Sequence, residues 1–346
     1  MKKSPVTLFV TLLLSFFALV SAEAQTVLTW DPGAVQSGSE LHTETSGLAG
    51  LYEFEITTTN VNSVGLWRTV LNVSSGEANL YIRNGAPAAT NSYSYKSDQT
   101  GSDDIVTTFS AGQTWSLLVV AEAGAQWSIF AGDIHLTELT WDPGTADLGT
   151  EVFTNQNTDG AAHYFKITTE LPDLGAWRTA LRVNSGEANL YLKQNTLPYK
   201  NSSAYSYTHA STYAGDDGVA LQLSNTSGSG QEWYILVDST AGADWNLYSG
   251  DVYAQDLGVL ATNSASGSGL ASIPAEGIRF YKTTIPVETS AWRLWLQDAA
   301  GSATLAKPFY IRKGLAPHPS STSYYDKTRV GQGLLVPTYL IPGSAD

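Results

Sequence analysis

Residues 67–81 read WRTVLNVSSGEANLY, and residues 177–191 read WRTALRVNSGEANLY. In the first copy, Trp67 and every second residue as far as Val73 can face a core, while Arg68 stands on the opposite side. Successive side chains of a strand point to opposite faces, so this alternation predicts a half-buried strand. The Ser-Ser-Gly-Glu segment after Val73 is typical of a turn, and the next residues predict a second strand. The chain therefore contains the same strand–turn–strand unit twice.

The repetition extends to both sides of this unit. The segment LTWDPG occupies residues 28–33 and returns at 139–144. Its Asp-Pro-Gly part is typical of a turn, because Pro presets φ and Gly allows positive φ. A third, shorter copy starts near Leu257. Solenoid repeats run about 20–50 residues, whereas a unit of about 110 residues has the size of a domain. We therefore expect β-sandwich domains over residues 25–138, 139–256 and 257–346, the last one incomplete at its C-terminal end.

The composition of each copy favours strands throughout. Short runs rich in Val, Ile, Thr, Tyr, Phe and Trp are separated by Gly, Asn, Ser and Asp. Strands that recur every ~8–12 residues, with turn signals between them, are typical of an antiparallel sandwich. No stretch after residue 24 has the period of an amphipathic helix. The predicted fold class is all-β, with tandem antiparallel β-sandwich modules that are jelly-roll-like.

The N-terminus has the three parts of an export signal. Lys2 and Lys3 precede an apolar stretch over residues 6–20, and Ala22-Glu23-Ala24 has the small-x-small pattern of a cleavage site. The alternative is a membrane anchor, but a spanning helix needs about 20 apolar residues and this stretch is shorter. We expect residues 1–24 to be a signal peptide and the protein to be secreted or held at the cell surface, with no membrane span.

Charge and composition exclude several classes of function. The chain has 18 Lys and Arg against 32 Asp and Glu, a formal net charge of −14, and no Cys. Binding to a phosphate backbone relies on clustered Lys and Arg, so a nucleic-acid partner is not expected. Without Cys there is no disulfide, thiolate zinc site or cysteine nucleophile. The five His do not recur between copies, and neither Gly-x-Ser-x-Gly nor His-Glu-x-x-His occurs. These residues predict a protein that is not an enzyme.

Four short motifs follow one another in the first copy: Gly-Glu-Ala-Asn-Leu-Tyr-Ile-Arg from Gly76, Gly-Ala-Pro from Gly85, Tyr-Ser-Tyr from Tyr93, and Ala-Gly from Ala111 before a Trp-led strand. Their order resembles the bacterial pre-peptidase C-terminal (PPC-like) domain, a secreted β-sandwich module. The resemblance implies a non-catalytic appendage of exported peptidases or large surface proteins; some members bind extracellular polymers and some carry calcium. Glu77 and Asn79 stand where that family usually has Asp.

Two pairs of adjacent acids are candidate calcium ligands. Asp103-Asp104 in the first copy is matched with Asp216-Asp217 in the second, and each pair precedes a predicted strand. Calcium takes six to eight oxygen ligands, and such carboxylates supply them. The alternative is a solvated turn before a strand. Calcium is the one cofactor for which the sequence contains candidate ligands.

Tyrosines are the candidate ligand-binding residues. Tyr93 and Tyr95 lie two positions apart in Ser- and Asn-rich surroundings, and Tyr205 and Tyr207 repeat this arrangement. Exposed aromatic rings stack on sugar rings or dock on a polymer, because they bring a large area at a low cost in conformational entropy. The alternative is that one Tyr closes the end of the sandwich and bonds the backbone through its hydroxyl.

The Arg after each strand Trp also has two interpretations. Arg68, Arg178 and Arg293 could form a basic docking row, or each could pair with a neighbouring carboxylate or an aromatic ring. We favour pairing, because isolated surface charges contribute little by themselves. The preceding Trp residues are expected in the core.

The sequence thus predicts tandem modules that act as a spacer or as weak units binding an extracellular polysaccharide or a protein polymer. Repetition raises avidity even when each copy binds weakly. The alternative is the N-terminal part of a secreted, peptidase-like hydrolase whose catalytic domain lies beyond Asp346.

Overall fold

The computed structural model describes residues 25–34, 41–59, 65–98, 100–145, 153–157, 162–172, 174–201, 204–223, 230–259, 278–286, 309–317 and 327–329. Every regular element in these ranges is a β-strand, and most strand pairs are antiparallel, which confirms the all-β sandwich class. No helix in the described ranges is long and apolar enough to cross a membrane. The expected signal peptide and the third Trp-Arg pair, Trp292-Arg293, lie outside the described residues.

The first sandwich consists of two sheets. One contains, in spatial order, β1 (Thr26–Val27), β3 (Gly50–Thr57), β8 (Thr114–Ala121), β5 (Ala78–Asn84) and β6 (Tyr95–Ser97). The other contains β2 (His42–Thr45), β9 (Gln126–Asp133), β4 (Leu66–Ser75) and β7 (Asp103–Thr108). From β2 to β9 the chain passes between the sheets in the order of a jelly roll, and β1 is added in parallel to β3.

The second sandwich repeats this order strand for strand. Its first sheet contains β10 (Thr137–Glu138), β12 (Ala162–Thr168), β19 (Glu232–Ser239), β14 (Ala188–Gln194) and β17 (His209–Ser211). Its second sheet contains β11 (Phe153–Asn157), β20 (Ala243–Asp251), β13 (Ala176–Ser185) and β18 (Asp217–Gln222). A small hairpin of β15 (Tyr199–Asn201) and β16 (Ala204–Ser206) precedes β17.

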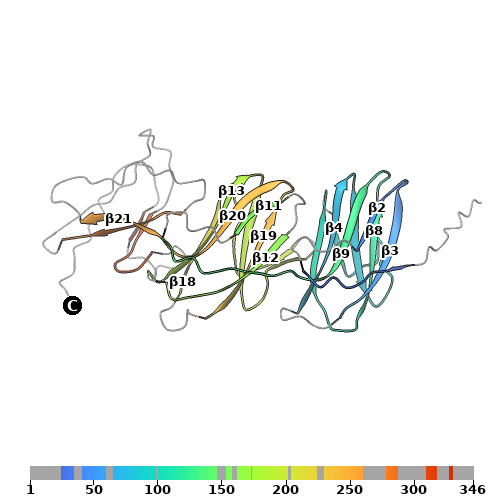
Figure 1. The fold of residues 1–346 in the computed structure, drawn as a ribbon, viewed down its shortest axis with the longest axis horizontal. Helices are drawn as coiled ribbons and strands as arrows, with labels where there is room; N and C mark the ends of the chain where they lie inside the picture. The colour runs from blue at the N-terminus through green and yellow to red at the C-terminus, as the bar shows by residue number, and fades with distance from the viewer. Residues whose placement is uncertain are drawn as a thin grey trace, which may run out of the picture.

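The third region starts like the first two. β21 (Ala254–Val259) pairs in parallel with β22 (Phe280–Thr284), as β1 does with β3, and β23 (Phe309–Ile311) pairs with β24 (Lys327–Arg329). The domain boundaries remain a prediction. Because β10 pairs within the second sandwich and β21 pairs with β22, we propose to start the second and third units a few residues earlier, at Thr137 and Ala254. Figure 1 shows the units one after another along the long axis.

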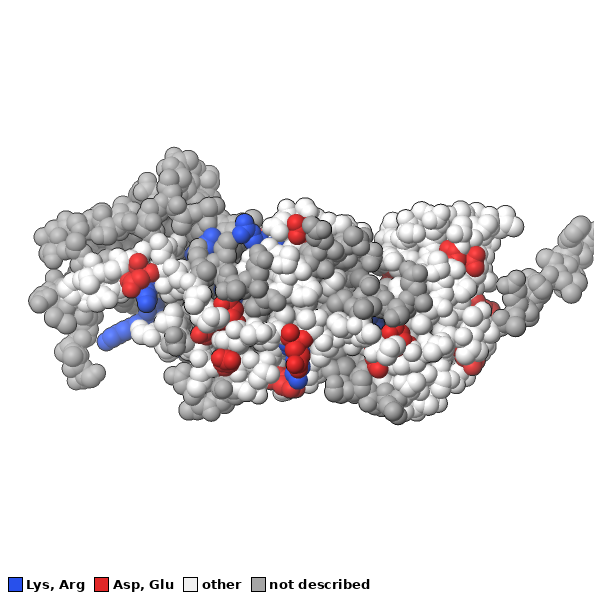
Figure 2. All heavy atoms as spheres, in the orientation of Figure 1, with Lys and Arg blue, Asp and Glu red and all other residues white. Residues whose placement is uncertain are grey.

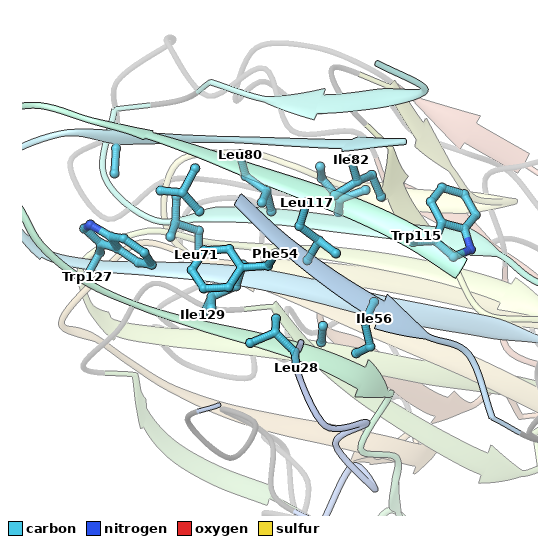
Figure 3. Close-up of a cluster of buried hydrophobic side chains, with 14 of the residues drawn as sticks. Leu28, Phe54, Ile56, Leu71, Leu80, Ile82, Trp115, Leu117, Trp127 and Ile129 are labelled. Carbon is cyan, nitrogen blue, oxygen red and sulfur yellow. The ribbon is translucent and has the colours of Figure 1, made fainter. Parts of the chain in front are cut away.

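Each sandwich has its own apolar core between its two sheets. In the first, Phe54 and Leu117 from one sheet meet Leu71 and Ile129 from the other. Figure 3 shows Trp127 and Trp115 at opposite ends of this cluster, with Phe54 and Leu117 between them. The predicted core positions of the motif Trp residues are confirmed, since Trp67 and Trp177 are 0% and 1% exposed.

The Asp-Pro-Gly turn closes the sandwich through backbone contact. The Asp31 amide donates to the Ala131 carbonyl at 3.0 Å, and the Asp133 amide donates to the Asp31 carbonyl at 2.8 Å. A Cβ at Gly132 would lie 2.1 Å from the Asp31 carbonyl oxygen, so only Gly permits this approach. Asp142 and Gly250 repeat the contact in the second copy. Two motifs about 100 residues apart in sequence therefore form one feature of the fold.

Strand β4 differs from the predicted half-buried strand. Trp67 and Leu71 face the core as expected, but Arg68 and Val70, which point to the other face, are also buried, at 6% exposed each. The second face is covered because the next sandwich packs against it, an arrangement that the alternation within one copy does not reveal.

Candidate functional site

The outer face of the sheet β2-β9-β4-β7 packs against the outer face of the sheet β10-β12-β19-β14-β17. We call this contact the junction. Its buried apolar side chains come from both sandwiches: Leu66, Val106 and Ile134 on one side, and Ala162, Tyr164, Tyr191, Leu197, Tyr234 and Leu236 on the other. Leu136, Tyr199 and Tyr205 pack at its edge.

Arg68 is the charged centre of the junction. Its Nε lies 3.2 and 3.1 Å from the two carboxylate oxygens of Asp104, and its Nη2 donates to Oδ2 at 2.8 Å. Its guanidinium lies 5.5 Å from the ring centre of Tyr164, which belongs to the second sandwich. The predicted pairing with a carboxylate is thus present for Arg68, but the pair is buried between modules instead of exposed.

Burial and charge act in opposite directions on Arg68. Burial alone lowers the pKa of its guanidinium, but the charge and hydrogen bonds of Asp104 more than compensate, so the pKa is raised. Burial also raises the pKa of Tyr164 well above its ordinary value, and Asp104 adds to this. The Arg68 guanidinium therefore stays charged, and the Tyr164 phenol stays neutral, at any physiological pH.

A hollow of about 250 Å³ opens beside this ion pair. Residues of both sandwiches line it: Ser97, Thr100, Ser102 and Asp104 from the first, and Ala162, Asn189, Leu236, Asp238, Ser239 and Thr240 from the second. Most of these side chains carry a hydroxyl, amide or carboxylate group, whereas Ala162 and Leu236 are apolar.

The tyrosines that are equivalent in the two folded copies differ by two residues from those matched in the sequence. Tyr95 pairs with Ile82 in β6–β5, and the matching strand pair β17–β14 places His209 beside Leu192. Tyr207 is therefore the counterpart of Tyr93, not of Tyr95. The ring distances agree: Tyr93 lies 5.5 Å from Tyr81, and Tyr207 lies 5.4 Å from Tyr191. The equal spacing assumed from the sequence fails because the second copy contains the extra hairpin β15–β16.

The four candidate tyrosines fall into two groups. Tyr93 and Tyr207 are exposed, at 40% and 49%, and can contact a ligand. Tyr95 packs against Trp115 at 6.4 Å, in line with the alternative interpretation of a Tyr at the end of the core. Tyr205 stacks on Tyr191 at 4.5 Å and 7°, and its hydroxyl donates to Asp238 at 2.5 Å. Burial, followed by the charge of Asp238, raises the pKa of Tyr205 far above its ordinary value.

The two Asp-Asp pairs matched in the sequence also do not occupy the same positions in the two copies: they differ by one residue. Asp103 lies opposite Leu71, and Asp217 lies opposite the equivalent Leu181. Both are buried and both accept a hydroxyl bond of 2.6 Å, from Ser97 and Ser211 respectively. The counterpart of Asp104 is accordingly Gly218, and that of Asp216 is Ser102. The acidic pairs predicted from the sequence are therefore not equivalent positions.

Each of these acids has at least one oxygen that accepts a bond from a protein group, while Oδ2 of Asp217 is buried without a hydrogen-bond partner among the described residues. Asp103 also accepts the Leu80 amide at 3.1 Å, Asp104 holds Arg68, and Asp216 accepts the Val183 amide at 2.8 Å. Burial raises the pKa of Asp217. Within the described ranges no group of three or more His, Cys, Asp or Glu is placed to hold a metal ion. Calcium binding at these aspartates stays a prediction, and these contacts give it no added support.

The described His residues are spread over separate contacts. His42 lies 3.6 Å from Glu44, and His135 Nδ1 lies 2.8 Å from the Gly33 carbonyl. His209 packs against Trp233. His163 packs against Trp245, and burial, aided by the charges of Arg68 and His135, lowers its pKa to about 4.

Among the described residues on the face shown in Figure 2, Lys and Arg side chains do not gather into a patch. Figure 2 shows acidic side chains scattered over this face, with the few basic ones mainly toward the C-terminal part of the chain. This distribution agrees with the formal charge of −14.

Two junction residues that sequence reasoning missed, Tyr164 and Tyr234, carry a signal in the sequence. The exposed Glu53 of the first copy is replaced by the fully buried Tyr164 in the second, and Ser116 is replaced by Tyr234. Polar residues that become aromatic at outward positions of a repeated strand indicate a covered face. A comparison of the copies position by position would have found the junction.

No family model matches this chain, and no curated protein matches it. Among solved structures, the N-terminal CBM22-1–CBM22-2 tandem domain of Paenibacillus barcinonensis Xyn10C is 10% identical and has a TM-score of 0.16; the match covers 65% of this chain and 99% of that one. A protein of unknown function of the DUF861 family from Pseudomonas syringae pv. tomato is 13% identical, with a TM-score of 0.13 and coverage of 66% and 94%. At these TM-scores neither likeness bears on the function of this chain.

Proposed function

We propose that this chain is a non-catalytic protein, secreted or held at the cell surface, whose stacked β-sandwiches form a stiff spacer with weak polymer-binding units. The observation that supports the spacer is the buried junction. Domains joined by exposed polar linkers move relative to one another. Here the connection between β9 and β10 has only three residues; Ile134 belongs to the buried cluster, and the partly buried Leu136 packs against its edge.

The junction also fixes the orientation of the two sandwiches. Arg68 binds Asp104 within the first sandwich while it lies over the Tyr164 ring of the second. A guanidinium that is paired and stacked at once has a narrow range of geometries. Rotation of one sandwich on the other would expose apolar side chains of the junction and separate the cation from the ring.

Polymer contact is assigned to the equivalent exposed residues Tyr93 and Tyr207. Tyr93 lies against Tyr81 of β5, Tyr207 lies against Tyr191 of the equivalent strand β14, and both Tyr93 and Tyr207 are open to solvent. A fixed spacing between two weak aromatic sites favours extended ligands, because the second contact is made at a high effective concentration.

The binding part is tested by retention of the full chain on insoluble polysaccharides and on collagen. We expect the double variant Tyr93→Ala and Tyr207→Ala to lose retention on the polymer that holds the unmodified chain. Tyr213→Ala is the matched control, because Tyr213 is 58% exposed but lies outside these ring pairs. Equal retention of the double variant, or no retention on any polymer, would remove the binding role and leave the spacer.

A further inference from the structure

We infer that the hollow at the junction is a binding site for one unit of a neutral, polyhydroxylated sugar. The site goes beyond the proposed function, which places polymer contact at the exposed Tyr93 and Tyr207. It is built by both sandwiches: Thr100 and Ser102 lie on one side, and Asn189 and Asp238 lie on the other. The site therefore exists only while the junction is closed.

The hydrogen-bonding groups of the hollow are held in place. The Ser102 hydroxyl donates to Asn72 Oδ1 at 3.0 Å, and the Thr240 hydroxyl donates to the Glu187 carbonyl at 3.2 Å. Asp104 is fixed by Arg68 and Asp238 by the Tyr205 hydroxyl. Groups that are already oriented lose little conformational entropy when a ligand binds.

Charge selects a neutral ligand. None of the described residues that line the hollow is Lys or Arg, and the nearby Arg68 is engaged by Asp104. Asp238 adds a carboxylate, so an anionic ligand would be repelled. Sugar hydroxyls can donate hydrogen bonds to a carboxylate. They can also donate to and accept from the Asn189 amide, which has both kinds of group.

Size and shape agree with a single sugar unit. At about 250 Å³ the hollow is slightly smaller than the ~300–1,000 Å³ of ordinary small-molecule sites. Ala162 gives part of its wall an apolar character, which suits the C–H face of a pyranose ring, while the hydroxyl and carboxylate groups suit its edge.

The sequence repeat supplies a matched pair of variants. Asn189 and Asn79 occupy the same position of the identical segment Ser-Gly-Glu-Ala-Asn-Leu-Tyr, and both are half-buried. Only Asn189 lines the hollow. The full chain is run in native gels that contain soluble xylan, mannan or β-glucan, with pectin as the anionic arm and calcium or glucosamine as the cationic arms. We expect at least one neutral glycan to retard it, Asn189→Ala to weaken this binding by about tenfold or more, and Asn79→Ala to leave it unchanged.

A second variant guards against indirect effects. Thr100 is exposed and lines the mouth of the hollow, so Thr100→Trp should block the site without touching the core. Retardation that survives both Asn189→Ala and Thr100→Trp overturns the site, as does binding only to pectin, calcium or glucosamine, or retardation by none of the neutral glycans. The gels are therefore run in the Tyr93→Ala and Tyr207→Ala background, which leaves the hollow intact because neither residue lines it. Retardation lost on going to this background belongs to the exposed tyrosines, and retardation that remains and is weakened by Asn189→Ala belongs to the hollow.

Discussion

Asp103 shows how a residue with the chemistry of a metal ligand serves the fold. It is fully buried, and its two oxygens accept the Ser97 hydroxyl and the Leu80 amide. Asp217 keeps the hydroxyl bond in the second copy. Buried polar groups need hydrogen-bond partners, and the hydrogen bonds of Asp103 link three strands. Its role is therefore structural. The sequence showed the acids but not which atoms face them.

Removal of this carboxylate should destabilise the first sandwich. Asp103→Ala leaves the Leu80 amide and the Ser97 hydroxyl without an acceptor, at a cost of about 1–3 kcal/mol each. Urea unfolding followed by tryptophan fluorescence measures the loss. Asp98→Ala is the control, because Asp98 pairs with Lys96 at the surface and should cost less than about 1 kcal/mol. If the loss at Asp103 appears only with calcium present and vanishes with a chelator, the result supports the calcium prediction.

His163 should make the stability depend on pH. Its pKa is about 4 in the folded chain against an ordinary 6.5, so the unfolded chain binds more protons between these values. Stability is then complete above about pH 6.5 and is lost as the pH falls toward 4, by roughly 3 kcal/mol at most. Unfolding midpoints of the unmodified chain and of His163→Gln, measured from pH 7 to 4, test this. Parallel curves for the two proteins would contradict it.

In each sandwich, the Asp-Pro-Gly turn near the start of the copy is held against the last strand of the copy. The Asp-Pro-Gly turn is local chemistry, with the Gly33 amide donating to Asp31 Oδ1 at 2.8 Å and φ of Gly33 at 66°. Its partner Gly132 lies in β9, at the far end of the copy. The same pairing of Asp142 with Gly250 shows that the closure belongs to the unit.

Gly132→Ala should therefore be far more harmful than an ordinary Gly to Ala change. The new Cβ would meet the Asp31 backbone at 2.1 to 2.5 Å, so the turn must separate from β9, and we expect a loss of about 3 kcal/mol or failure to fold. Gly47→Ala is the control, since a Cβ there meets nothing within 4 Å. Thermal melting of both variants decides the matter; similar midpoints would show that the contact does not hold the turn.

The two sandwiches are coupled through one buried face. Arg68→Ala removes the partner of Asp104 and the cation above Tyr164. Loss of one member of a buried pair costs about 3–5 kcal/mol, and the partial exposure of Asp104 places this variant near the lower value.

X-ray scattering of the full chain in solution measures the consequence. The unmodified protein should scatter as a rod of fixed length, and Arg68→Ala should scatter as units that move relative to one another. Lys96→Ala, which breaks only the exposed pair with Asp98, should leave the curve unchanged. A curve for Arg68→Ala that superposes on that of the unmodified chain contradicts the stiff spacer.

Local pattern was enough for the strands, the turns and the core. Alternation around Trp67 and Trp177 depends on near neighbours in sequence, and it predicted the core-facing residues correctly, although not the burial of the other face of β4. The turn residues after each strand are local in the same way. The copies were also visible, because identical segments need no structure to be recognised.

The sequence of a single copy does not show that the outer face of one sandwich packs against the outer face of the next. Whether Arg68 faces water or Tyr164, and whether Tyr207 or Tyr205 matches Tyr93, depends on strand register and on how one sandwich packs on the next. Those relations join residues up to about 100 positions apart, and burial of an outward face leaves no periodic trace within its own strand. Contacts between sandwiches therefore had to come from the folded chain, while each sandwich could be derived from its own residues.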